Sequence, residues 1–569
     1  MPFPEKIPRW VPPLAIGLMV AATFHTLLKN GPVWDDTALI FENPYLSSWH
    51  RAPALFTMDM WTASGQQEAS DFYRPMTMVT YLINRTLGGG SPASYHVGNL
   101  LLHLAACLLL YLLARRAAGG RRWFGALFAA ACFALAPIDS EPVIWLSGRF
   151  DVLVALFAVL TVLIHRDRGL RATIAVPLVF IAGMLCKESA VVIPVLLACD
   201  DLLQRRLLSR PSLIRFGAIA VLFAGYLACR RAVGVATAAA ASGAGVGELF
   251  RAYWLNAANS LRLLAWPIGL DPFHPYEPPG WPAAILWAAT CLLPIAALLV
   301  FVRRHPEHER AKTALLGSAW FLIALAPVTA TGPNLQMTGD RYAYLPMAGL
   351  FLAASAGVGA LEERMSRRAL LWALYGAGAL VLISFSITTS TRIGDWKDEP
   401  TLFRASLRSH PGNPYALYSL GALAAQRGDL DEAEPLLLES LRNREDAWRT
   451  HDALCFVYLR RGALGKAEGY CRRSLALNRK NPRTWVNLAS VHVDSRRWAE
   501  ALEETNRALA LKPRYAEGEY LRGIALGNLG RIDEARAAIR RALEIDPKHA
   551  GALDVQRRLR AAPLRAGSR

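Results

Sequence analysis

Long apolar runs separated by short basic connections fill the first two thirds of the chain. Eleven of these runs approach the roughly 20 apolar residues that a helix needs to cross a bilayer. The predicted spans are residues 11–28, 97–114, 123–138, 150–165, 172–186, 189–203, 213–229, 282–302, 313–330, 343–360 and 369–389. Beyond about residue 393 the apolar runs end and charged residues become frequent. The pattern predicts a polytopic membrane domain over residues 1–392, with a large first loop at 29–96, and a soluble part after it.

The soluble part repeats itself every 34 residues. Alanines mark the period, because 467−433, 501−467 and 535−501 all equal 34: Ala433, Ala467, Ala501 and Ala535. Small residues recur at fixed offsets from these alanines, at Gly421, Cys455, Ala489 and Gly523 and again at Ser440, Ser474, Ala508 and Ala542. Pairs of helices that cross closely at small residues are typical of the tetratricopeptide repeat. We therefore predict an all-α chain: a membrane helix bundle followed by a solenoid of four repeats at 414–558.

The flanks of the solenoid have predicted roles of their own. Residues 393–413 are predicted to be a linker with a partial repeat, and residues 559–569 a disordered tail. Stacked repeats leave a concave groove suited to extended peptides, so a protein acceptor or partner is expected there. Cys455 and Cys471 fall on facing helices of one repeat. Two core thiols are the favoured interpretation, and a disulfide in an oxidising compartment is the alternative.

Composition supports an integral membrane protein, since 53% of the residues are hydrophobic and only 19% are charged. The net charge of +18 could point to nucleic acid, but many Arg and Lys residues stand between apolar runs, where they orient membrane helices. The eight cysteines form no CxxC pair, so no metal knuckle is indicated. The first run resembles a signal peptide, but it has no convincing cleavage site and many spans follow it. We therefore expect a retained anchor.

The basic clusters predict an orientation. With eleven spans, clusters such as Arg115–Arg116, Arg205–Arg206 and Arg303–Arg304 all fall on one side, which the positive-inside rule makes cytoplasmic. The N-terminus is then cytoplasmic and the repeats lie on the periplasmic or extracytoplasmic side of the inner (plasma) membrane. Residues 251–268 are apolar but carry two Arg and two Asn. A helix in the outer interface or packed inside the bundle is therefore favoured over a twelfth span.

The connections that this orientation places outside collect candidate chemistry. They carry Asp35, Asp36, Tyr73, Arg74, Asp139, Glu141, Arg149, Asp151, Lys187, Glu188, Asp340 and Arg341. Cations on the outer side depart from the positive-inside trend, and a phosphate-bearing ligand would explain them. His96 and His103 are seven residues apart and share one face of the second predicted span. A lone buried histidine is more often structural, so both interpretations stay open for this pair.

Several motifs together resemble a known family. "VWDDTALIFENPYL", "YRPMTMVTYLINRTLGG", "SYHVGNLLLHLAACLLLY", "EPVIWLSGRFDVL", "MLCKESAVVIPVLL" and "DRYAYLP" occur in this order and precede the repeats. The chain resembles the transmembrane and tetratricopeptide repeat-containing O-mannosyltransferases, as a bacterial-type member. The resemblance implies a GT-C glycosyltransferase fold and a polyprenyl-phosphate sugar as donor. It also implies an essential acidic residue in the first outer loop, which acts as general base or, in some branches, holds a metal.

The same residues suit the chemistry of glycosyl transfer. A base must take the acceptor proton, and cations must stabilise the departing lipid phosphate. Asp35 and Asp36 are the catalytic candidates, and which of them is the base stays open. Donor-phosphate candidates are Arg74, Arg149, Lys187 and Arg341, with the first two preferred. Further active-site candidates are Tyr73, His96, His103, Glu141, Asp151, Glu188 and Asp340, and a metal requirement is left open. Two interpretations stay open for Asp139, Glu141 and Asp151: they shape the sugar site, or they cap helix ends.

Three functions remain in competition. The favoured one is transfer of a hexose, with mannose the candidate, from a polyprenyl-phosphate sugar to a protein hydroxyl outside the cytoplasm. The second is transfer to a lipid or surface polysaccharide, with the repeats recruiting partners. The third is a non-catalytic membrane-anchored scaffold, against which the intact acidic and basic candidates argue. For the Asp-Asp pair alone, a helix cap or solvated turn is the plain structural alternative.

Overall fold

The computed structural model describes residues 8–64, 72–117, 123–167, 169–235, 244–329 and 337–561. The chain folds as two compact units, Met1–Ala405 and Ser406–Arg569. The boundary between them falls inside the region predicted to be a linker, residues 393–413. That region is largely helical, because one helix runs on to Asp395 and the next covers Glu399–Ser409. The predicted tail lies outside the described residues from position 562 onward.

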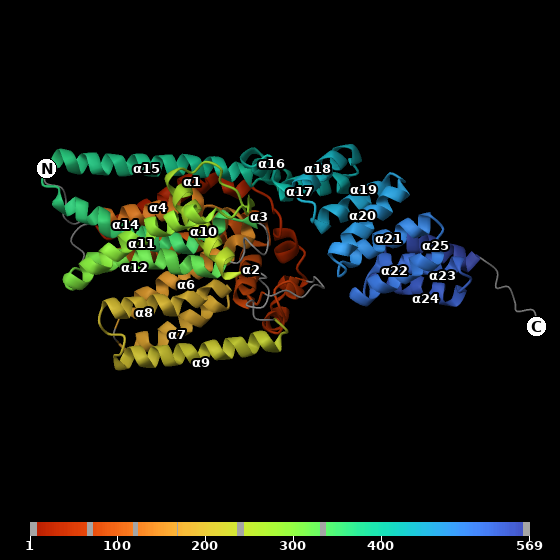
Figure 1. Cartoon of the computed structure of the whole chain (residues 1–569). Helices are drawn as coiled ribbons and strands as arrows, with labels where there is room; N and C mark the ends of the chain where they lie inside the picture. Colours follow the sequence, from red (N-terminus) through yellow and green to blue (C-terminus); the bar gives the residue numbers. More distant parts are fainter. Residues whose placement is uncertain are drawn as a thin grey trace, which may run out of the picture. The chain divides into compact units, whose positions relative to one another are not determined.

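All eleven predicted spans coincide with helices of the first unit (Figure 1). Its helices are α1 (Val11–Phe24), α2 (Pro75–Gly88), α3 (Pro92–Ala117), α4 (Phe124–Leu135), α5 (Glu141–Ile144), α6 (Arg149–His165), α7 (Leu170–Met184), α8 (Ile193–Leu203), α9 (Arg210–Ala232), α10 (Val246–Ala265), α11 (Trp281–Arg304), α12 (Glu309–Leu325), α14 (Tyr344–Arg364) and α15 (Arg368–Asp395). The first unit is therefore an all-α bundle, as the apolar runs predict.

Fewer helices than eleven have the length and composition of an uninterrupted span. Within the described residues, eight are long and apolar enough to cross a membrane, and the bent pair Phe124–Leu135 plus Pro137–Ile144 makes a ninth. Two predicted spans, α7 and α8, are shorter. At about 1.5 Å per residue, the 15 residues of α7 reach about 22 Å, which is less than the roughly 30 Å of a hydrocarbon core. The chain between them turns at Lys187–Glu188, and this turn belongs to the site described below.

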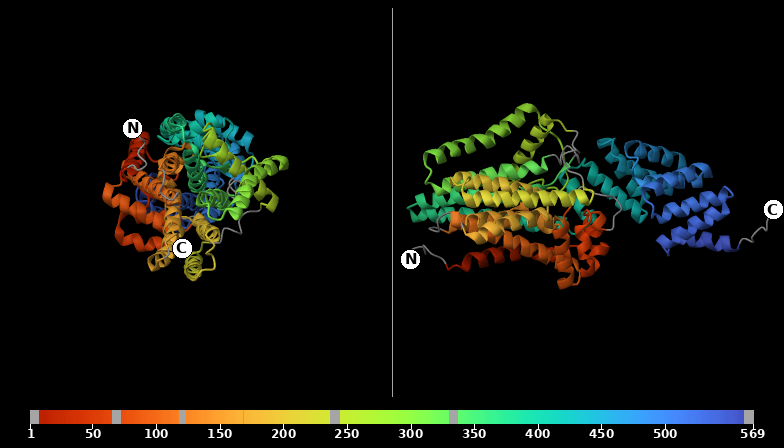
Figure 2. Two further views of the ribbon diagram at one scale, coloured as in Figure 1. Left: turned by 90° about the vertical axis from the view of Figure 1, so that its left-hand side faces the viewer. Right: turned by 90° about the horizontal axis from the view of Figure 1, so that it is seen from below.

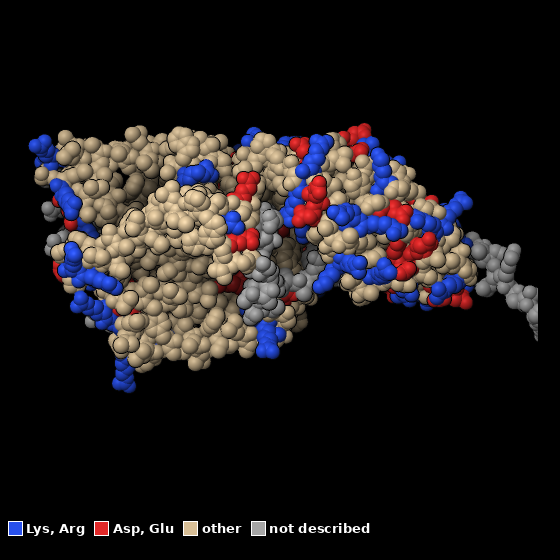
Figure 3. Space-filling model, viewed as in Figure 1, with Lys and Arg blue, Asp and Glu red and all other residues tan. Residues whose placement is uncertain are grey.

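The helices of the bundle lie roughly parallel to one another and differ in how much lipid-facing surface they present (Figures 1 and 2). α6 lies at the centre, since 78% of its most apolar stretch is buried inside the protein, whereas α11 and α15 each bury only 11% of theirs. A helix that is apolar all round but exposed within the protein requires lipid on its outer face. In Figure 3 the visible side of the bundle is mostly uncharged, and Lys and Arg gather at the end where α8 meets α9 and α11 meets α12.

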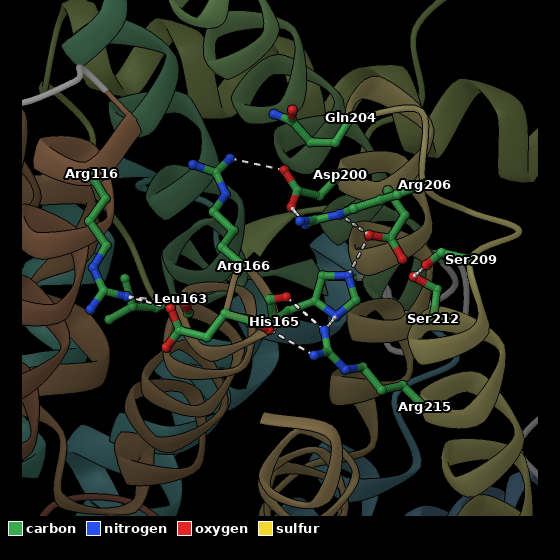
Figure 4. A network of polar contacts seen from close by, with 12 residues as sticks. Arg116, Leu163, His165, Arg166, Asp200, Gln204, Arg206, Ser209, Ser212 and Arg215 are labelled. Carbon is green, nitrogen blue, oxygen red and sulfur yellow. Dashed lines mark hydrogen bonds and ion pairs between the residues drawn. The ribbon is translucent and has the colours of Figure 1, made fainter. Parts of the chain in front are cut away.

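The basic connections meet at that end of the bundle. Arg116, Arg166, Arg206 and Arg310, from four different connections, line one cavity of about 690 Å³. Beside it, Asp200 accepts from Arg166 and Arg206, each at 2.9 Å (Figure 4). His165 Nε2 lies 2.9 Å from Asp201 Oδ1, and Arg215 donates to the His165 carbonyl oxygen at 2.7 Å. The clusters that the positive-inside argument assigns to one side therefore do lie together.

The segment 251–268 forms most of α10, which is not among the described helices that could cross a membrane. It packs against the bundle, and Tyr253 donates its hydroxyl to the carbonyl oxygen of Leu322 on α12 at 2.6 Å. After α10, strand β1 (His274–Pro275) pairs antiparallel with β2 (Met337–Thr338), with His274 opposite Thr338. This two-stranded pairing brings the chain before α11 to the start of α14.

The second unit is the predicted solenoid. Its helix pairs are α17 (Pro414–Arg427) with α18 (Leu430–Asn443), α19 (Trp448–Arg460) with α20 (Leu464–Leu477), α21 (Pro482–Asp494) with α22 (Trp498–Leu511), and α23 (Ala516–Asn528) with α24 (Ile532–Ile545), followed by α25 (Ala550–Ala561). The four period-marking alanines are buried. A Cβ on Gly421 would approach Leu437 Cγ to 2.7 Å, which explains the small residue at this crossing.

Cys455 and Cys471 form a disulfide across one helix pair, with their Cα atoms 5.1 Å apart. The prediction of two core thiols is therefore wrong for this pair, and the alternative holds. Both residues are fully buried and lie where α19 crosses α20. The crossing distance allowed by small residues is what brings their Cβ atoms within bonding range.

Candidate active site

The Asp-Asp motif lies in a tight turn between α1 and a single helical turn at Thr37–Phe41. Asp36 is fully buried and accepts three hydrogen bonds. One comes from the backbone N–H of Val33 at 3.0 Å, and two come from Ser147, through its N–H at 2.8 Å and its hydroxyl at 2.6 Å. Burial raises the pKa of Asp36 to about 7, against the lowering effect of the Ser147 and Val33 hydrogen bonds. Asp36 therefore joins the first large loop to the connection that precedes α6.

Asp35 has a different environment although it is the next residue. Its side chain is partly exposed, and no hydrogen bond or ion pair reaches its carboxylate from the residues that the structure describes. Burial raises the pKa of Asp35 to about 6. The Arg341 guanidinium lowers it and the Glu399 carboxylate raises it further. A carboxylate of a partly exposed residue that has no bonded partner among the described residues and a raised pKa can serve as a general base at neutral pH.

Trp34 places this pair against a group of aromatic rings. Its backbone adopts φ +55°, a left-handed conformation that non-glycine residues seldom take. Its ring stacks on Trp145 at 4.8 Å and meets Phe273 edge-on at 4.9 Å. The Arg341 guanidinium lies over both indole rings, 5.2 Å from that of Trp34 and 5.5 Å from that of Trp145. The strained turn is thus held by packing on one side of Asp35 and by hydrogen bonds to Asp36 on the other.

Three of the four predicted phosphate-binding cations stand in a row with aromatic rings between them. Arg74 and Lys187 lie over the ring of Phe150, at 4.7 and 5.7 Å. Lys187 and Arg341 lie over the ring of Tyr342, at 5.8 and 4.7 Å. We call Arg74, Phe150, Lys187, Tyr342 and Arg341 the cation row. Each cation is attracted to the face of the ring beside it by a cation–π contact.

Each cation of the row has a carboxylate partner from the predicted site residues. Arg74 donates to Glu188 through Nε and Nη2, at 3.0 and 2.8 Å. Lys187 contacts Asp151, and Arg341 donates through Nη1 to Glu141 at 2.7 Å. Burial lowers the pKa of Lys187, and Asp151 opposes that shift. Glu141, Asp151 and Glu188 are therefore partners of the cations.

Arg149, by contrast, faces neutral groups inside the bundle. It is buried and donates to Asn99 Oδ1 at 2.6 Å and to the carbonyl oxygens of Thr80 and Tyr95 at 3.1 and 3.0 Å. Its guanidinium also lies 4.6 Å from the Tyr81 ring centroid. These contacts join α2, α3 and the start of α6. The geometry does not bring Arg149 into the cation row, so the preference given to it on sequence grounds finds no support.

Asp340 belongs to a second buried network beside the row. It lies 2.7 Å from both His274 Nε2 and Arg392 Nη2, and it accepts from the backbone N–H of Asp271 at 2.9 Å. Arg392 also lies 3.6 Å from Glu141, the partner of Arg341. The pKa of His274 is raised, because the Asp340 carboxylate outweighs the opposing effect of burial. This network joins α15, the strand at His274 and the short helical turn Asp340–Ala343 behind the site.

The remaining candidates lie outside the cation row. His103 Nδ1 lies 2.6 Å from the Tyr344 hydroxyl and its Nε2 lies 3.1 Å from the Ala134 carbonyl oxygen, so it is a satisfied core histidine. His96 is buried beside the backbone of Asn30. Tyr73 donates its hydroxyl to the Phe56 carbonyl oxygen at 2.9 Å and its N–H to Glu188 at 3.1 Å. Asp139 is buried, with both carboxylate oxygens unbonded among the described residues.

Sequence reasoning missed several residues that shape the site. Ser147 bonds Asp36, Glu399 accepts from the backbone N–H of Trp34 at 3.0 Å, and Arg392 and His274 hold Asp340. The "EPVIWLSGRFDVL" motif contains Ser147, so its neighbours were a signal for it. The other three stand far from the acidic motif along the chain. Among the described residues, no group of three or more His, Cys, Asp or Glu side chains is placed to hold a metal ion.

The fold is a bundle of apolar helices followed by a unit of helical repeats. The chain is similar over most of its length to proteins named protein O-mannosyl-transferases. Tmtc1 of Drosophila melanogaster is 26% identical over 526 residues, covering 73% of this chain and 60% of that protein. TMTC3 of Mus musculus is 23% identical, covering 94% of this chain and 63% of that protein. TMTC4 of Homo sapiens is 26% identical, covering 73% and 64%. The family resemblance drawn from the motifs is thereby confirmed.

The chain spans about three fifths of the length of these curated relatives. The family model described as tetratricopeptide repeat matches residues 401–447 and 486–550. Among solved structures, the crystal structure of MamA protein matches with a TM-score of 0.24 and 21% identity, over 26% of this chain and 82% of that one. The crystal structure of YrrB, a TPR protein, matches with a TM-score of 0.25 and 18% identity, over 32% and 91%.

Proposed function

We propose that the protein is a GT-C glycosyltransferase that moves a hexose, with mannose the candidate, from a polyprenyl-phosphate sugar to a protein hydroxyl group. The names of its relatives support transfer of mannose to proteins. The observation that carries the proposal is the contrast between Asp35 and Asp36. One carboxylate is committed to Ser147 and Val33, and the other is unbonded, partly exposed and next to the cation row.

In this proposal Asp35 is the general base. It takes the proton of the acceptor hydroxyl while the hydroxyl oxygen attacks the anomeric carbon, and the bond from that carbon to the lipid-phosphate oxygen breaks. The proton remains on Asp35, and the electron pair of the broken bond leaves with the polyprenyl phosphate. Attack from the face opposite the leaving phosphate inverts the anomeric centre. Asp36 is a positioning residue, because its three hydrogen bonds hold the turn from which Asp35 projects.

The cation row receives the charge that develops on the departing phosphate. Lys187 and Arg341 flank Tyr342, and Arg341 is also the cation whose charge acts on Asp35. Fixed cations next to a leaving phosphate stabilise the transition state more than they would in water. Their carboxylate partners Asp151 and Glu141 hold them in place before the donor arrives. Arg74, paired with Glu188, extends the row, whereas Arg149 acts by holding α2, α3 and α6 together.

We place this site on the extracytoplasmic side of a plasma membrane. Four arginines from separate connections line one cavity, and they include members of the basic clusters that the positive-inside rule assigns to the cytoplasm. The acidic motif belongs to the opposite set of connections in the eleven-helix order. The disulfide between Cys455 and Cys471 supports the same orientation for the repeats, because disulfides persist in oxidising compartments.

The repeat unit is proposed to recruit the acceptor protein. The first helices of successive pairs, α17, α19 and α21, line a groove of about 400 Å³ together with the start of α23. The groove is lined by residues that include Phe456, Arg460, Val486, Asn487, Ser490 and Tyr515. Apolar and aromatic side chains interleaved with hydrogen-bonding groups suit an extended peptide, whose backbone needs donors and acceptors along its length.

Reconstituted full-length protein tests the proposal. We expect it to transfer mannose from polyprenyl-phosphate mannose, and not from the soluble donor GDP-mannose, to a hydroxyl-bearing protein acceptor, with inversion detected by NMR of the product. If sugar from the lipid-linked donor reaches only a lipid or polysaccharide acceptor, the proposed protein acceptor is wrong and the acceptor is of that other class. Absence of transfer to all three acceptor classes, in a preparation that unfolds cooperatively, would contradict the enzymatic function.

A further inference from the structure

The turn that carries Asp35 is attached to the chain that follows the last helix of the bundle. Asn30 donates its side-chain amide to the carbonyl oxygen of Ile393 at 2.8 Å, and the N–H of Gly31 donates to the carbonyl oxygen of Lys397 at 3.0 Å. The N–H of Trp34 then donates to Glu399 Oε1 at 3.0 Å. Three hydrogen bonds therefore join two segments that lie more than 360 residues apart in the sequence.

Glu399 reaches Trp34 because its own helix is capped by its neighbour. α16 (Glu399–Ser409) begins at Glu399, and Asp398 accepts from the N–H of Thr401 at 2.9 Å, the bond of a helix cap. The carboxylate of Glu399 is left to bind outside the helix. Phe403, one turn further along α16, stacks on Phe273 at 5.5 Å, and Phe273 meets the ring of Trp34. α16 therefore contacts the acidic turn through both a hydrogen bond and a line of rings.

The contact falls on the strained residue of the turn. Trp34 is one of three described non-glycine residues with positive φ. A left-handed tryptophan is maintained only where the surroundings hold it, and here its N–H bonds Glu399 while its ring packs on Trp145. Because Asp35 directly follows Trp34, the direction of its carboxylate depends on this conformation.

Glu399 also acts on Asp35 through its charge. The charged groups that affect the Asp35 carboxylate are Arg341 and Glu399, and Asp36 interacts with it from the next position. Arg341 favours the ionised form, and Glu399 favours the protonated form. A carboxylate beside another carboxylate holds its proton more tightly and is therefore a stronger base once ionised.

We propose that Glu399 is the positioning residue of the catalytic base: its carboxylate accepts from the N–H of Trp34 and so fixes the left-handed turn from which Asp35 projects. This inference rests on the proposed function of Asp35. It assigns a role in glycosyl transfer to a residue outside all the motifs that carry the family resemblance. It also places that residue at the start of α16, the helix that runs across the boundary between the two units.

The pH dependence of transfer by the full chain tests the inference. In Glu399→Gln the amide oxygen still accepts from the N–H of Trp34 but the charge is gone. We expect its maximal kcat to fall, but by less than that of Glu399→Ala, because the turn is kept while Asp35 becomes a weaker base. Because a nearby negative charge raises the pKa of Asp35, its removal should move the acid limb of the kcat profile to lower pH. Glu399→Ala removes the acceptor as well, and its kcat should fall about tenfold at every pH, with an unchanged KM for the donor.

Asp398→Asn is the matched control, since it removes an adjacent negative charge while keeping a capping oxygen. Its acid limb should not move. An unshifted limb in Glu399→Gln, together with parental kcat in a cooperatively folded Glu399→Ala, would overturn the inference. The variant Asp35→Asn separates this failure from failure of the proposed function. If Asp35→Asn is active, Asp35 is not the base and the proposed function of this residue is refuted. If Asp35→Asn is inactive while the Glu399 variants show no shift, only the role of Glu399 is refuted.

Discussion

Asp36 and Ser147 are joined by two hydrogen bonds, one from the Ser147 N–H at 2.8 Å and one from its hydroxyl at 2.6 Å, although 111 residues separate them. Asp35, the neighbour of Asp36, receives no such bond from the described residues. Adjacent carboxylates of one motif therefore have different surroundings, and this difference is the basis for proposing Asp35 as the base.

The structural task of Asp36 predicts a loss of stability on substitution. Asp36→Ala leaves buried donors of Ser147 and Val33 unpaired, which costs about 1–3 kcal/mol for each unsatisfied group. Ser147→Ala removes a single hydroxyl bond and should cost about 1 kcal/mol. Thermal unfolding of the detergent-solubilised protein measures both effects. Asp35→Ala, which removes the same kind of side chain without breaking a side-chain hydrogen bond, is the control, and an equal loss in that variant would argue against the assignment.

The base predicts an acid limb in the rate of transfer. Because burial raises the pKa of Asp35 to about 6, its active ionised form is dominant above that pH and disappears as the pH falls through it. The kcat of transfer should therefore decline below about pH 6 with a slope of one proton. The measurement is kcat from pH 4.5 to 8.5 under donor saturation. A limb near the ordinary value of 3.8 for an aspartate would mean that burial does not act on the base as described.

The cation row predicts a specific defect in donor binding. Replacing Lys187 by Gln and Asp151 by Asn together removes both charges of the pair and keeps a hydrogen bond, so the fold is not left with an unpaired buried ion. The KM for the polyprenyl-phosphate sugar should rise about tenfold, because a charge-assisted contact to phosphate is lost.

Arg149→Gln is the contrasting variant for that experiment. It should lower the unfolding temperature through loss of the bonds to Asn99, Thr80 and Tyr95, without raising the KM for the donor. If instead Arg149→Gln raises the KM for the donor and the Lys187 and Asp151 double variant does not, then Arg149, and not Lys187, contacts the phosphate.

The disulfide predicts both stability and location. Cys455 and Cys471 enclose a short loop, with a sequence separation of 16, and closure of such a loop contributes about 3 kcal/mol. Because both sulfurs are buried, alkylation is done on denatured protein from acid-quenched cells, before and after reduction, and both thiols should react only after reductant is added. Cys455→Ser should lower the unfolding temperature of the repeats. Two freely alkylated thiols in the mature protein would contradict placement of the repeats outside the cytoplasm.

The connection at α16 predicts that the point of truncation matters. A chain ending at His410 keeps Glu399, Lys397 and Ile393, which bond the acidic turn. It should retain transfer to a small soluble acceptor but lose transfer to protein acceptors, because the repeat groove is absent. A chain ending at Asp395 should lose both activities. Equal glycoprotein profiles for the full chain and the His410 truncation would remove the repeats from acceptor recruitment.

Periodicity predicted most of the fold. Each predicted apolar run coincides with a helix of the bundle, although α2 and α5 lie outside these runs, and the 34-residue period located each helix pair of the solenoid. The helices α7 and α8, with 15 and 11 residues, are shorter than an uninterrupted span. Apolarity marks a helix buried among other helices as readily as one that crosses lipid, so composition could not separate the two cases.

The sequence supplied most residues of the proposed site. The motifs contained Asp35, Arg74, Lys187 and Arg341, and residue type alone ranked Arg149 directly after Arg74. The structure distinguishes their surroundings, since Arg74 has a carboxylate partner, whereas Arg149 has carbonyl and amide oxygens. Glu399 lies outside these motifs, and Ser147 lies within one of them, but residue type alone does not pair either residue with the acidic turn. Their contacts with the acidic turn join segments distant in the sequence, and no spacing along one chain records such a contact.

Transfer by Asp35→Asn compared with Asp36→Asn tests the central claim most directly. Both variants remove one carboxylate from the same turn, and both are assayed as reconstituted full-length protein with polyprenyl-phosphate mannose and a hydroxyl-bearing acceptor. We predict that Asp35→Asn keeps the unfolding temperature of the parent and loses about 10²–10⁴-fold in kcat, as expected for removal of a general base. Asp36→Asn should unfold at lower temperature and keep measurable transfer. Full activity in Asp35→Asn, or inactivity confined to a stably folded Asp36→Asn, would contradict the account.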